Sequence, residues 1–229
     1  MITDLENALI KNAHNFHPVV DFDPDSDKLF RFNFSSTNTE LSPEDISNTG
    51  IFSEYINNKL KGEGAKYGIG GYGENRTIYR RSELFKSGEE RSVHLGVDIW
   101  GPAGTKIYAA LGGMVHSFAF NEEFGDYGAT IILLHQLDTI AFYTLYGHLS
   151  LKDISGLLEG AYVTRGEVIG HFGEPAENGH WPPHLHFQII RDMKTMKGDF
   201  PGVCRFSEKD EWLSNCPNAD LILNMMKYL

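Results

Sequence analysis

The sequence predicts a mainly β protein, with an antiparallel β-sheet core and short helical appendages at both ends. Between residues 93 and 192, short β-rich runs such as TKIYAAL, ATIILLHQL and AFYTLYGHL alternate with Gly, Pro and Asn. Regularly spaced short strands of this kind are typical of a β core. Helical patterns occur only near the two ends. With 229 residues, of which 41% are hydrophobic, the chain can bury a sizeable core.

The net charge is −11, from 31 acidic and 20 basic residues. Nucleic acids and anionic membranes attract clustered Lys and Arg, so this balance excludes both as expected partners. The longest aliphatic run is Ile131–Leu134, far below the roughly 20 residues of a membrane span. Cys204 and Cys216 are too few for a thiolate zinc site; whether they pair or stay as inert thiols is left open.

The first 64 residues predict a small α+β appendage. Thr3 is a candidate cap for a short amphipathic helix over residues 3–14, and the alternation over residues 29–34 predicts a strand. Ser42 and Pro43 then have the pattern of a helix start, and that helix should end near Gly62.

A glycine-rich stretch, GEGAKYGIGGYGENR, follows over residues 62–76. It lacks the GxxxxGK[ST] pattern of a phosphate-binding loop. We therefore expect residues 65–92 to form a loop or flap and lead-in, with Tyr72 as a candidate substrate contact, although a plain linker fits equally well. At the other end, residues 193–229 predict a helical tail that packs on the core.

Five polar residues within the β-rich segment form the candidate site. His94 and Asp98 are four apart, and His184 and His186 are two apart, so each pair lies on one face of a strand. His148 follows a third strand pattern. Imidazole nitrogens and a carboxylate oxygen are the ligands of catalytic zinc, which keeps three protein ligands and one open position. The five residues thus supply three ligands and two acid/base groups.

The order and spacing of these motifs resemble the M23 (lysostaphin-type, LytM-like) zinc metallopeptidases. The resemblance covers residues 94–190 and includes HLGVDIWGPAGTKIYAALGGMV, LYGHLS, VTRGEVIGHFG and PHLHFQI. It implies a LytM-like core of the duplicated hybrid motif type and one Zn²⁺ per chain, held by His94, Asp98 and His186. It implies His148 and His184 as catalytic histidines, and peptides of peptidoglycan stems or cross-bridges as substrate.

Two departures from that family concern the approach to the site. The segment GEPAENGHWPP carries Glu174, Glu177 and Trp181, which we predict to contact substrate as an acidic rim and an apolar platform favouring an ammonium group. Gln188 stands where the family commonly has an acidic residue.

Two other functions stay open at this point. One is an inactive M23-like module that binds or activates another protein; the other is a cytoplasmic zinc hydrolase with a different class of substrate. The first residues lack the basic start and apolar centre of a secretory signal, which predicts a cytoplasmic protein or a processed exported form. The bond cleaved and the oligomeric state are not predicted.

Overall fold

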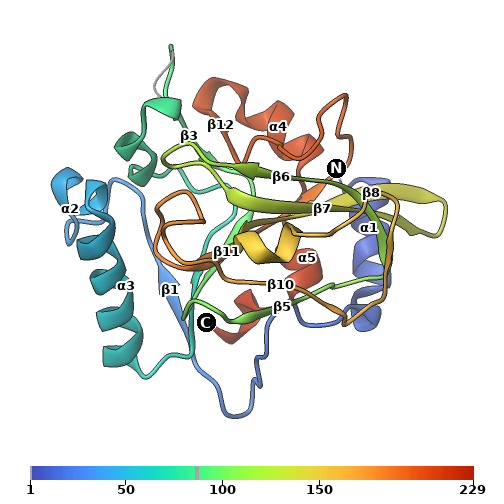
Figure 1. Ribbon diagram of the computed structural model, residues 1–229, viewed down its shortest axis with the longest axis horizontal. Coiled ribbons are helices and arrows are strands. Elements are labelled where there is room, and N and C mark those ends of the chain that lie inside the picture. Colours follow the sequence, from blue (N-terminus) through green and yellow to red (C-terminus); the bar gives the residue numbers. More distant parts are fainter. Residues whose placement is uncertain (1, 86–87) are drawn as a thin grey trace.

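The computed structural model describes residues 2–85 and 88–229, which form one large sheet with small sheets and helices around it (Figure 1). The large sheet has the strand order β1-β2-β4-β11-β8-β7-β6-β9. Its strands are β1 (Leu29–Phe32), β2 (Tyr67–Gly70), β4 (Val97–Trp100), β6 (Gly113–Asn121), β7 (Gly128–Leu137), β8 (Ile140–Leu149), β9 (Tyr162–Val163) and β11 (His184–Ile190). The β1–β2 pair is parallel and the pairs from β2 to β9 are antiparallel. The predicted fold class is confirmed.

Two small sheets and several helices complete the fold. The small sheets pair β3 (Arg91–His94) with β12 (Val203–Arg205), and β5 (Lys106–Tyr108) with β10 (Val168–His171). The α-helices are α1 (Asp4–Lys11), α2 (Pro43–Ser47), α3 (Thr49–Glu63), α4 (Lys209–Asn215) and α5 (Asp220–Leu223). The 3₁₀ helices are η1 (Ala13–Asn15), η2 (Ile78–Arg81), η3 (Glu83–Phe85), η4 (Leu151–Ile154), η5 (Phe206–Glu208) and η6 (Met226–Tyr228). No helix within the described ranges is long and apolar enough to cross a membrane.

The helix predicted from Ser42 to about Gly62 is two helices. Ser42 caps α2, and Pro43 takes its first position as expected. Asn48 then leaves the helical conformation, and its side chain accepts hydrogen bonds from Gly50 and Ile51, which begins α3. The prediction of one continuous helix was wrong because the cap at Asn48 restarts the chain.

The two faces of the large sheet have different roles, because side chains alternate along each strand. One face, with Val97, Ile99 and Leu185, is buried in a cluster that includes residues of α1 and α5. The other face carries Asp98, Trp100, His184 and His186 at the intervening positions. This second face is the one that positions the candidate site.

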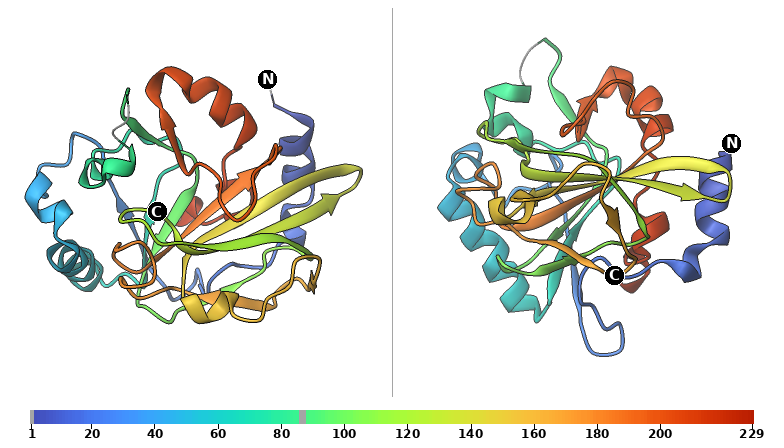
Figure 2. Two further views of the ribbon diagram at one scale, coloured as in Figure 1. Left: turned by 45° about the horizontal axis from the view of Figure 1, so that its top comes forward. Right: turned by 45° about the vertical axis from the view of Figure 1, so that its right-hand side comes forward.

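Two apolar clusters cover the second face at either side of the site. The first joins Phe32, Phe52, Trp100 and Trp181 beneath the N-terminal segment. The second joins Leu145, Ile190 and Cys216 with residues of the C-terminal tail. Figure 1 shows α3 beside β1, and Figure 2 shows the tail with α4 on one side of the sheet, across from η4. The site thus lies between two packed supports.

The predicted loop or flap over residues 65–92 needs correction, because residues 67–70 are the buried strand β2 in the large sheet. Its glycines make room for large side chains of the same face. A β-carbon at Gly68 would lie 2.1 Å from the Phe32 ring, and one at Gly70 would lie 2.4 Å from Nη2 of Arg76. Glycine content suggested a loop, whereas here it permits close packing. Residues 86 and 87 of this range lie outside the described residues.

The predicted appendage over residues 1–64 is not separate from the core. Its strand β1 pairs with β2 and so extends the large sheet. Its helix α3 contributes Phe52, whose ring packs 5.7 Å from that of Phe34 and 6.1 Å from that of Trp100. In the C-terminal tail, β12 pairs with β3, and Cys204 and Cys216 are free buried thiols. Both ends of the chain therefore pack on the sheet.

Replacing Phe52 should destabilise the whole protein. Phe52→Ala removes a fully buried ring between the N-terminal segment and the site, so we expect a loss of about 3–5 kcal/mol in the free energy of unfolding. Denaturant unfolding followed by fluorescence measures it. Ile51→Ala is the matched control, because Ile51 is 45% exposed on the same helix. An equally small decrease in the free energy of unfolding of both variants would show that the N-terminal segment does not support the core.

Candidate metal centre and pocket

Strand register brings the predicted site residues together on one face of the sheet. Asp98 on β4 lies directly opposite His186 on β11, and Trp100 lies opposite His184 two residues away. His94 ends β3, which belongs to the neighbouring small sheet. Opposite residues of antiparallel strands point to the same face, so the side chains of Asp98, Trp100, His184 and His186 share one face of the large sheet. All of them are buried.

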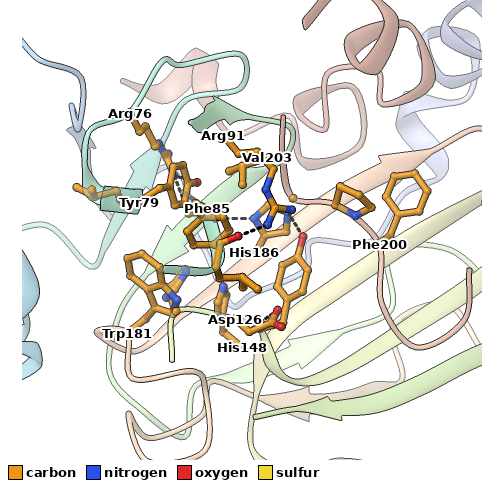
Figure 3. A pocket seen from close by; sticks show the side chains of 18 of the residues that line it. Arg76, Tyr79, Phe85, Arg91, Asp126, His148, Trp181, His186, Phe200 and Val203 are labelled. Atoms are coloured by element: carbon orange, nitrogen blue, oxygen red, sulfur yellow. Dashed lines mark hydrogen bonds and ion pairs between the residues drawn. The ribbon is translucent and has the colours of Figure 1, made fainter. Parts of the chain in front are cut away.

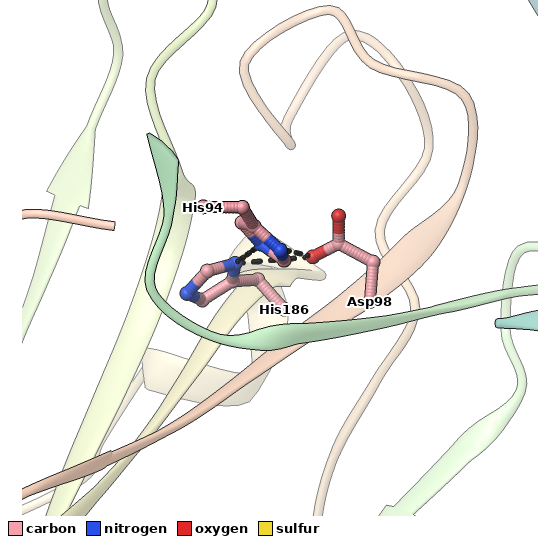
Figure 4. A group of neighbouring side chains, drawn as sticks. All are labelled: His94, Asp98 and His186. Atoms are coloured by element: carbon pink, nitrogen blue, oxygen red, sulfur yellow. Dashed lines mark hydrogen bonds and ion pairs between the residues drawn. The ribbon is translucent and has the colours of Figure 1, made fainter. Parts of the chain in front are cut away.

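His94, Asp98 and His186 form a compact triangle of donor atoms (Figure 4). Nε2 of His94 lies 3.0 Å from Nδ1 of His186 and 3.2 Å from Oδ1 of Asp98. Nδ1 of His186 lies 3.0 Å from the same Asp98 oxygen. Each residue thus contributes one atom to a common point.

Hydrogen bonds on the far side of each imidazole fix which nitrogen faces that point. Nδ1 of His94 lies 3.1 Å from the carbonyl of Gly71, so that nitrogen carries the proton. Nε2 of His186 lies 2.9 Å from Oε1 of Gln188, whose amide donates to the carbonyl of Pro201. A carbonyl can only accept, so the Gln188 amide orientation is fixed and Nε2 of His186 is the donor. Both inward nitrogens therefore present lone pairs.

Three acceptor atoms within 3.2 Å of one another repel unless a cation lies between them. A tetrahedral zinc ion, with bonds of about 2.0–2.1 Å, keeps such donors about 3.3–3.4 Å apart, a few tenths of an ångström from the distances here. Burial lowers the pKa of His94 to about 4. Burial opposes charge on Asp98, but His94 and the Arg76 guanidinium hold the pKa of this carboxyl well below its usual value. The residues present therefore fit zinc.

His148 and His184 lie beside this triangle with their ring centroids 4.0 Å apart. Nδ1 of His148 donates to the carbonyl of Asn178, and Nδ1 of His184 donates to that of Pro182, each at 2.8 Å. Each Nε2 is thus unprotonated and able to accept a proton. Burial lowers the pKa of His184 to about 4 and that of His148 well below its usual value. Both imidazoles are neutral at pH 7.

Backbone strain and aromatic packing hold these two imidazoles. His148 has a φ of 63°, a left-handed conformation that costs a non-glycine residue about 1–3 kcal/mol. His184 stacks on the indole of Trp100, with centroids 3.9 Å apart and planes at 17°. Trp181 meets both histidine rings edge-on. Such rigid packing fixes the ring orientations that acid/base chemistry requires.

Asp98, His148, His184 and His186 border a pocket of about 110 Å³, and Trp181 lies in its wall (Figure 3). Sequence reasoning missed several other lining residues that carry polar groups. These are Arg76, Tyr79, Arg91, Asp126, Tyr127 and Asp199. They come from the lead-in to β3, the β6–β7 connection and the segment before β12. None has a motif of its own; the pairing of residues 74–76 with β3 brings Arg76 to the site.

The predicted substrate contacts Tyr72, Glu174 and Glu177 do not line this pocket. Tyr72 donates a hydrogen bond to the carbonyl of Cys216 in the tail. Glu177 accepts backbone hydrogen bonds from Leu151 and Glu174, which order its own loop. The carboxylates that do border the pocket are Asp126 and Asp199, which sequence alone did not single out.

The site lies in a segment that matches a known family. The family model described as Peptidase family M23 matches residues 92–197, which include the triangle and both neighbouring histidines. The resemblance to the M23 family is confirmed. Residues 92–197 are called the M23 segment below; Arg76 and the strands β1 and β2 precede it.

Relatives of the M23 segment include peptidases of several bacteria. The L-Ala–D-Glu endopeptidase of Bacillus subtilis (strain 168) is 28% identical over 107 residues, 44% of this chain and 31% of the relative, so the chain spans less than a third of it. A zinc-containing peptidase of Vibrio cholerae is 28% identical, covering 48% of this chain and 32% of that one, at a TM-score of 0.35. The lysostaphin catalytic domain of Staphylococcus simulans is 22% identical. The match covers 70% of this chain and 96% of that one, at a TM-score of 0.38.

Gln188→Leu should weaken zinc binding. Leucine cannot accept the proton of His186 Nε2, so the ring loses the partner that turns its lone pair inward. We expect a loss of about 10–100-fold in zinc affinity, as for other outer partners of metal-binding histidines. Competition with a chromogenic chelator measures it. Gln136→Leu, on exposed β7 surface, is the matched control. Equal affinities for both variants would contradict the role of Gln188.

Proposed function

We propose that this protein is a zinc metalloendopeptidase that hydrolyses peptide bonds in peptidoglycan stem peptides or cross-bridges. The proposal rests on the match to Peptidase family M23 and on the chemistry of the buried residues. One observation carries it: three inward lone pairs and two neutral imidazoles lie beside one another. The M23 relationship gives the reaction class, and the site supplies the groups that such a reaction needs.

The ion would be held by His94, Asp98 and His186. When bound, zinc polarises the scissile carbonyl and lowers the pKa of water to about 7. The carboxylate is the single charged group among these three residues, so a net positive charge would remain at the centre. Three protein donors leave one tetrahedral position for substrate or water.

His148 and His184 would move the proton. Each has a free Nε2 because a backbone carbonyl holds the proton on Nδ1. Their lowered pKa values keep both unprotonated at neutral pH, so either can accept a proton from the attacking water. That proton then goes to the nitrogen of the leaving amine, and the second histidine can donate a hydrogen bond to the carbonyl oxygen only when it too carries a proton on Nε2. Both histidines are buried and have the same free nitrogen, so neither role is assigned to one of them.

Tyr127 adds a neutral hydrogen-bond donor to the same pocket. Its hydroxyl lies 3.4 Å from Nε2 of His186, and its ring contacts the rings of His148 and His186. Burial raises the pKa of this phenol well above its usual value, so the O–H stays protonated. A protonated phenol can support charge that develops on a substrate oxygen.

The substrate class follows from the relatives and is the part of the proposal that needs direct testing. The Bacillus relative is named for the L-Ala–D-Glu bond, which is therefore the first bond to test. An inactive binding module would not need both histidines with free Nε2 atoms. A zinc hydrolase with a different class of substrate would show itself by zinc binding without muropeptide cleavage.

Replacing the proposed zinc ligands and replacing the proposed catalytic histidines should have different effects on zinc content and on cleavage. His94→Ala and Asp98→Ala should lose zinc and activity together, because each removes one of three donors. His148→Ala and His184→Ala should keep about one zinc per chain and lose about 10²–10⁴-fold in kcat, the range for general acid–base groups. Elemental analysis and chromatography of digested muropeptides measure the two properties.

Two controls make this test decisive. His135→Gln replaces a buried histidine that hydrogen-bonds Gly112 and Thr144 away from the pocket, and it should keep both zinc and activity. A chelator should abolish cleavage, and added zinc should restore it. Wild-type protein that takes up no zinc would exclude the proposal. Protein that binds zinc but leaves every muropeptide intact would exclude peptidoglycan as substrate.

A further inference from the structure

Arg76 is a buried charge beside the candidate metal centre, and it lies outside the M23 segment. Its side chain has no exposed area. A buried guanidinium is costly unless it is paired and hydrogen-bonded, so its partners indicate what it does. Two carboxylates hold it: Nε donates to Oε2 of Glu74 at 2.6 Å, and Nη1 donates to Oδ2 of Asp98 at 2.5 Å.

The two oxygens of Asp98 therefore have different partners. Oδ1 faces the two imidazole nitrogens at 3.0 and 3.2 Å, whereas Oδ2 is bound by Arg76. A carboxylate with both oxygens free can bind a cation through both of them. With Oδ2 held by a guanidinium, Asp98 can offer Oδ1 alone.

Arg76 is itself fixed from several directions. Its backbone N–H donates to the carbonyl of Ser92, and the carbonyl of Glu74 accepts from the backbone of His94. The carboxylate of Glu74 also accepts from the backbone N–H of Phe34 at 3.0 Å. The guanidinium lies over Gly70, where a β-carbon would be 2.4 Å from Nη2. The N-terminal segment thus holds this arginine against Asp98.

We propose that Arg76 is a positioning residue that keeps Asp98 a single-oxygen ligand and so keeps the fourth position of the metal open. This inference rests on the proposed zinc site and extends it to a residue outside the M23 segment. In its absence Asp98 would bind through both oxygens, and its second oxygen would crowd the position that substrate or water needs. Metal would still bind, but catalysis would fall.

Cobalt-substituted protein tests this proposal without reference to activity. Four-coordinate Co²⁺ absorbs visible light more strongly than five-coordinate Co²⁺, so the spectrum reports the coordination number. In Arg76→Met we expect cobalt to remain bound and the absorption to fall about two-fold or more, because Oδ2 of Asp98 would enter as a fourth protein donor beside water and make the ion five-coordinate. Arg76→Lys retains a cation near Oδ2 and should recover most of the wild-type intensity.

Gly70→Ala gives a second variant that leaves the charge of Arg76 unchanged. Its β-carbon would occupy the place of Nη2 and displace the guanidinium from Asp98, so the same loss of absorption is expected. Gly62→Ala on α3 is the matched control, since a β-carbon there meets nothing within 4 Å. Arg81→Gln controls for loss of a buried arginine, because Arg81 packs on Trp181 and Phe124 rather than on Asp98.

The possible results separate this inference from the proposed function. Wild-type protein that binds no cobalt would overturn both. Wild-type intensity in cobalt-loaded Arg76→Met and Gly70→Ala would overturn the role of Arg76 alone. If Arg76→Met does not fold, Gly70→Ala decides by the same spectrum. Unfolding of both variants would also count against the proposal, because a positioning residue acts on coordination rather than on folding.

Discussion

The antiparallel pairing of β4 with β11, together with the end of β3, holds three lone pairs close to one another. The rest of the structure has to keep them there against their mutual repulsion. Asp98 and His186 are opposite each other in register, and His94 reaches them from the end of β3. A shift of one residue between β4 and β11 would send one of these side chains to the opposite face. The packing of Val97, Ile99 and Phe187 on that opposite face prevents such a shift. The apolar core therefore sets the geometry of the polar site.

The N-terminal segment and the C-terminal tail pack around this polar face and leave the pocket open. Aromatic rings from the N-terminal segment pack against Trp100, which stacks on His184. On the other side, Cys216 of the tail accepts a hydrogen bond from Gln188, which orients His186. Segments that lie outside residues 92–197 thus contact the partners of the site residues. This explains why the ends of the chain pack on the sheet instead of forming detached appendages.

The sequence was sufficient for the β core and for His184 and His186 sharing one face, because both follow from alternation along strands. His94 and Asp98 were expected on one strand but lie on β3 and β4, and the left-handed backbone of His148 also breaks the alternation. It was insufficient for the glycine-rich stretch. Glycine taken by itself suggests a loop, and its role in close packing can be recognised only when the side chains next to it in space are known. The ring of Phe32 covers Gly68 and the guanidinium of Arg76 covers Gly70, and neither contact has a sequence pattern that would reveal it. For the same reason Asp126 and Asp199, which line the pocket, could not be singled out, whereas Glu174 and Glu177, which were, lie outside its lining. The alternation of side chains along a strand is local and periodic, whereas the packing of a loop depends on residues elsewhere in the chain.

Charge balance connects the metal centre to the stability of the fold. Glu74, Arg76 and Asp98 form a chain of alternating charges with one net negative charge, and Arg76 and Asp98 are fully or almost fully buried. Gln188 is neutral, so no further negative charge is added behind His186. The inward lone pairs then face one another with a single carboxylate among them, an arrangement that is unfavourable until a cation binds. Binding of the ion would relieve this repulsion in the folded chain alone, because the unfolded chain does not hold the three donors together. Metal affinity and folding free energy are therefore two measures of the same buried interaction.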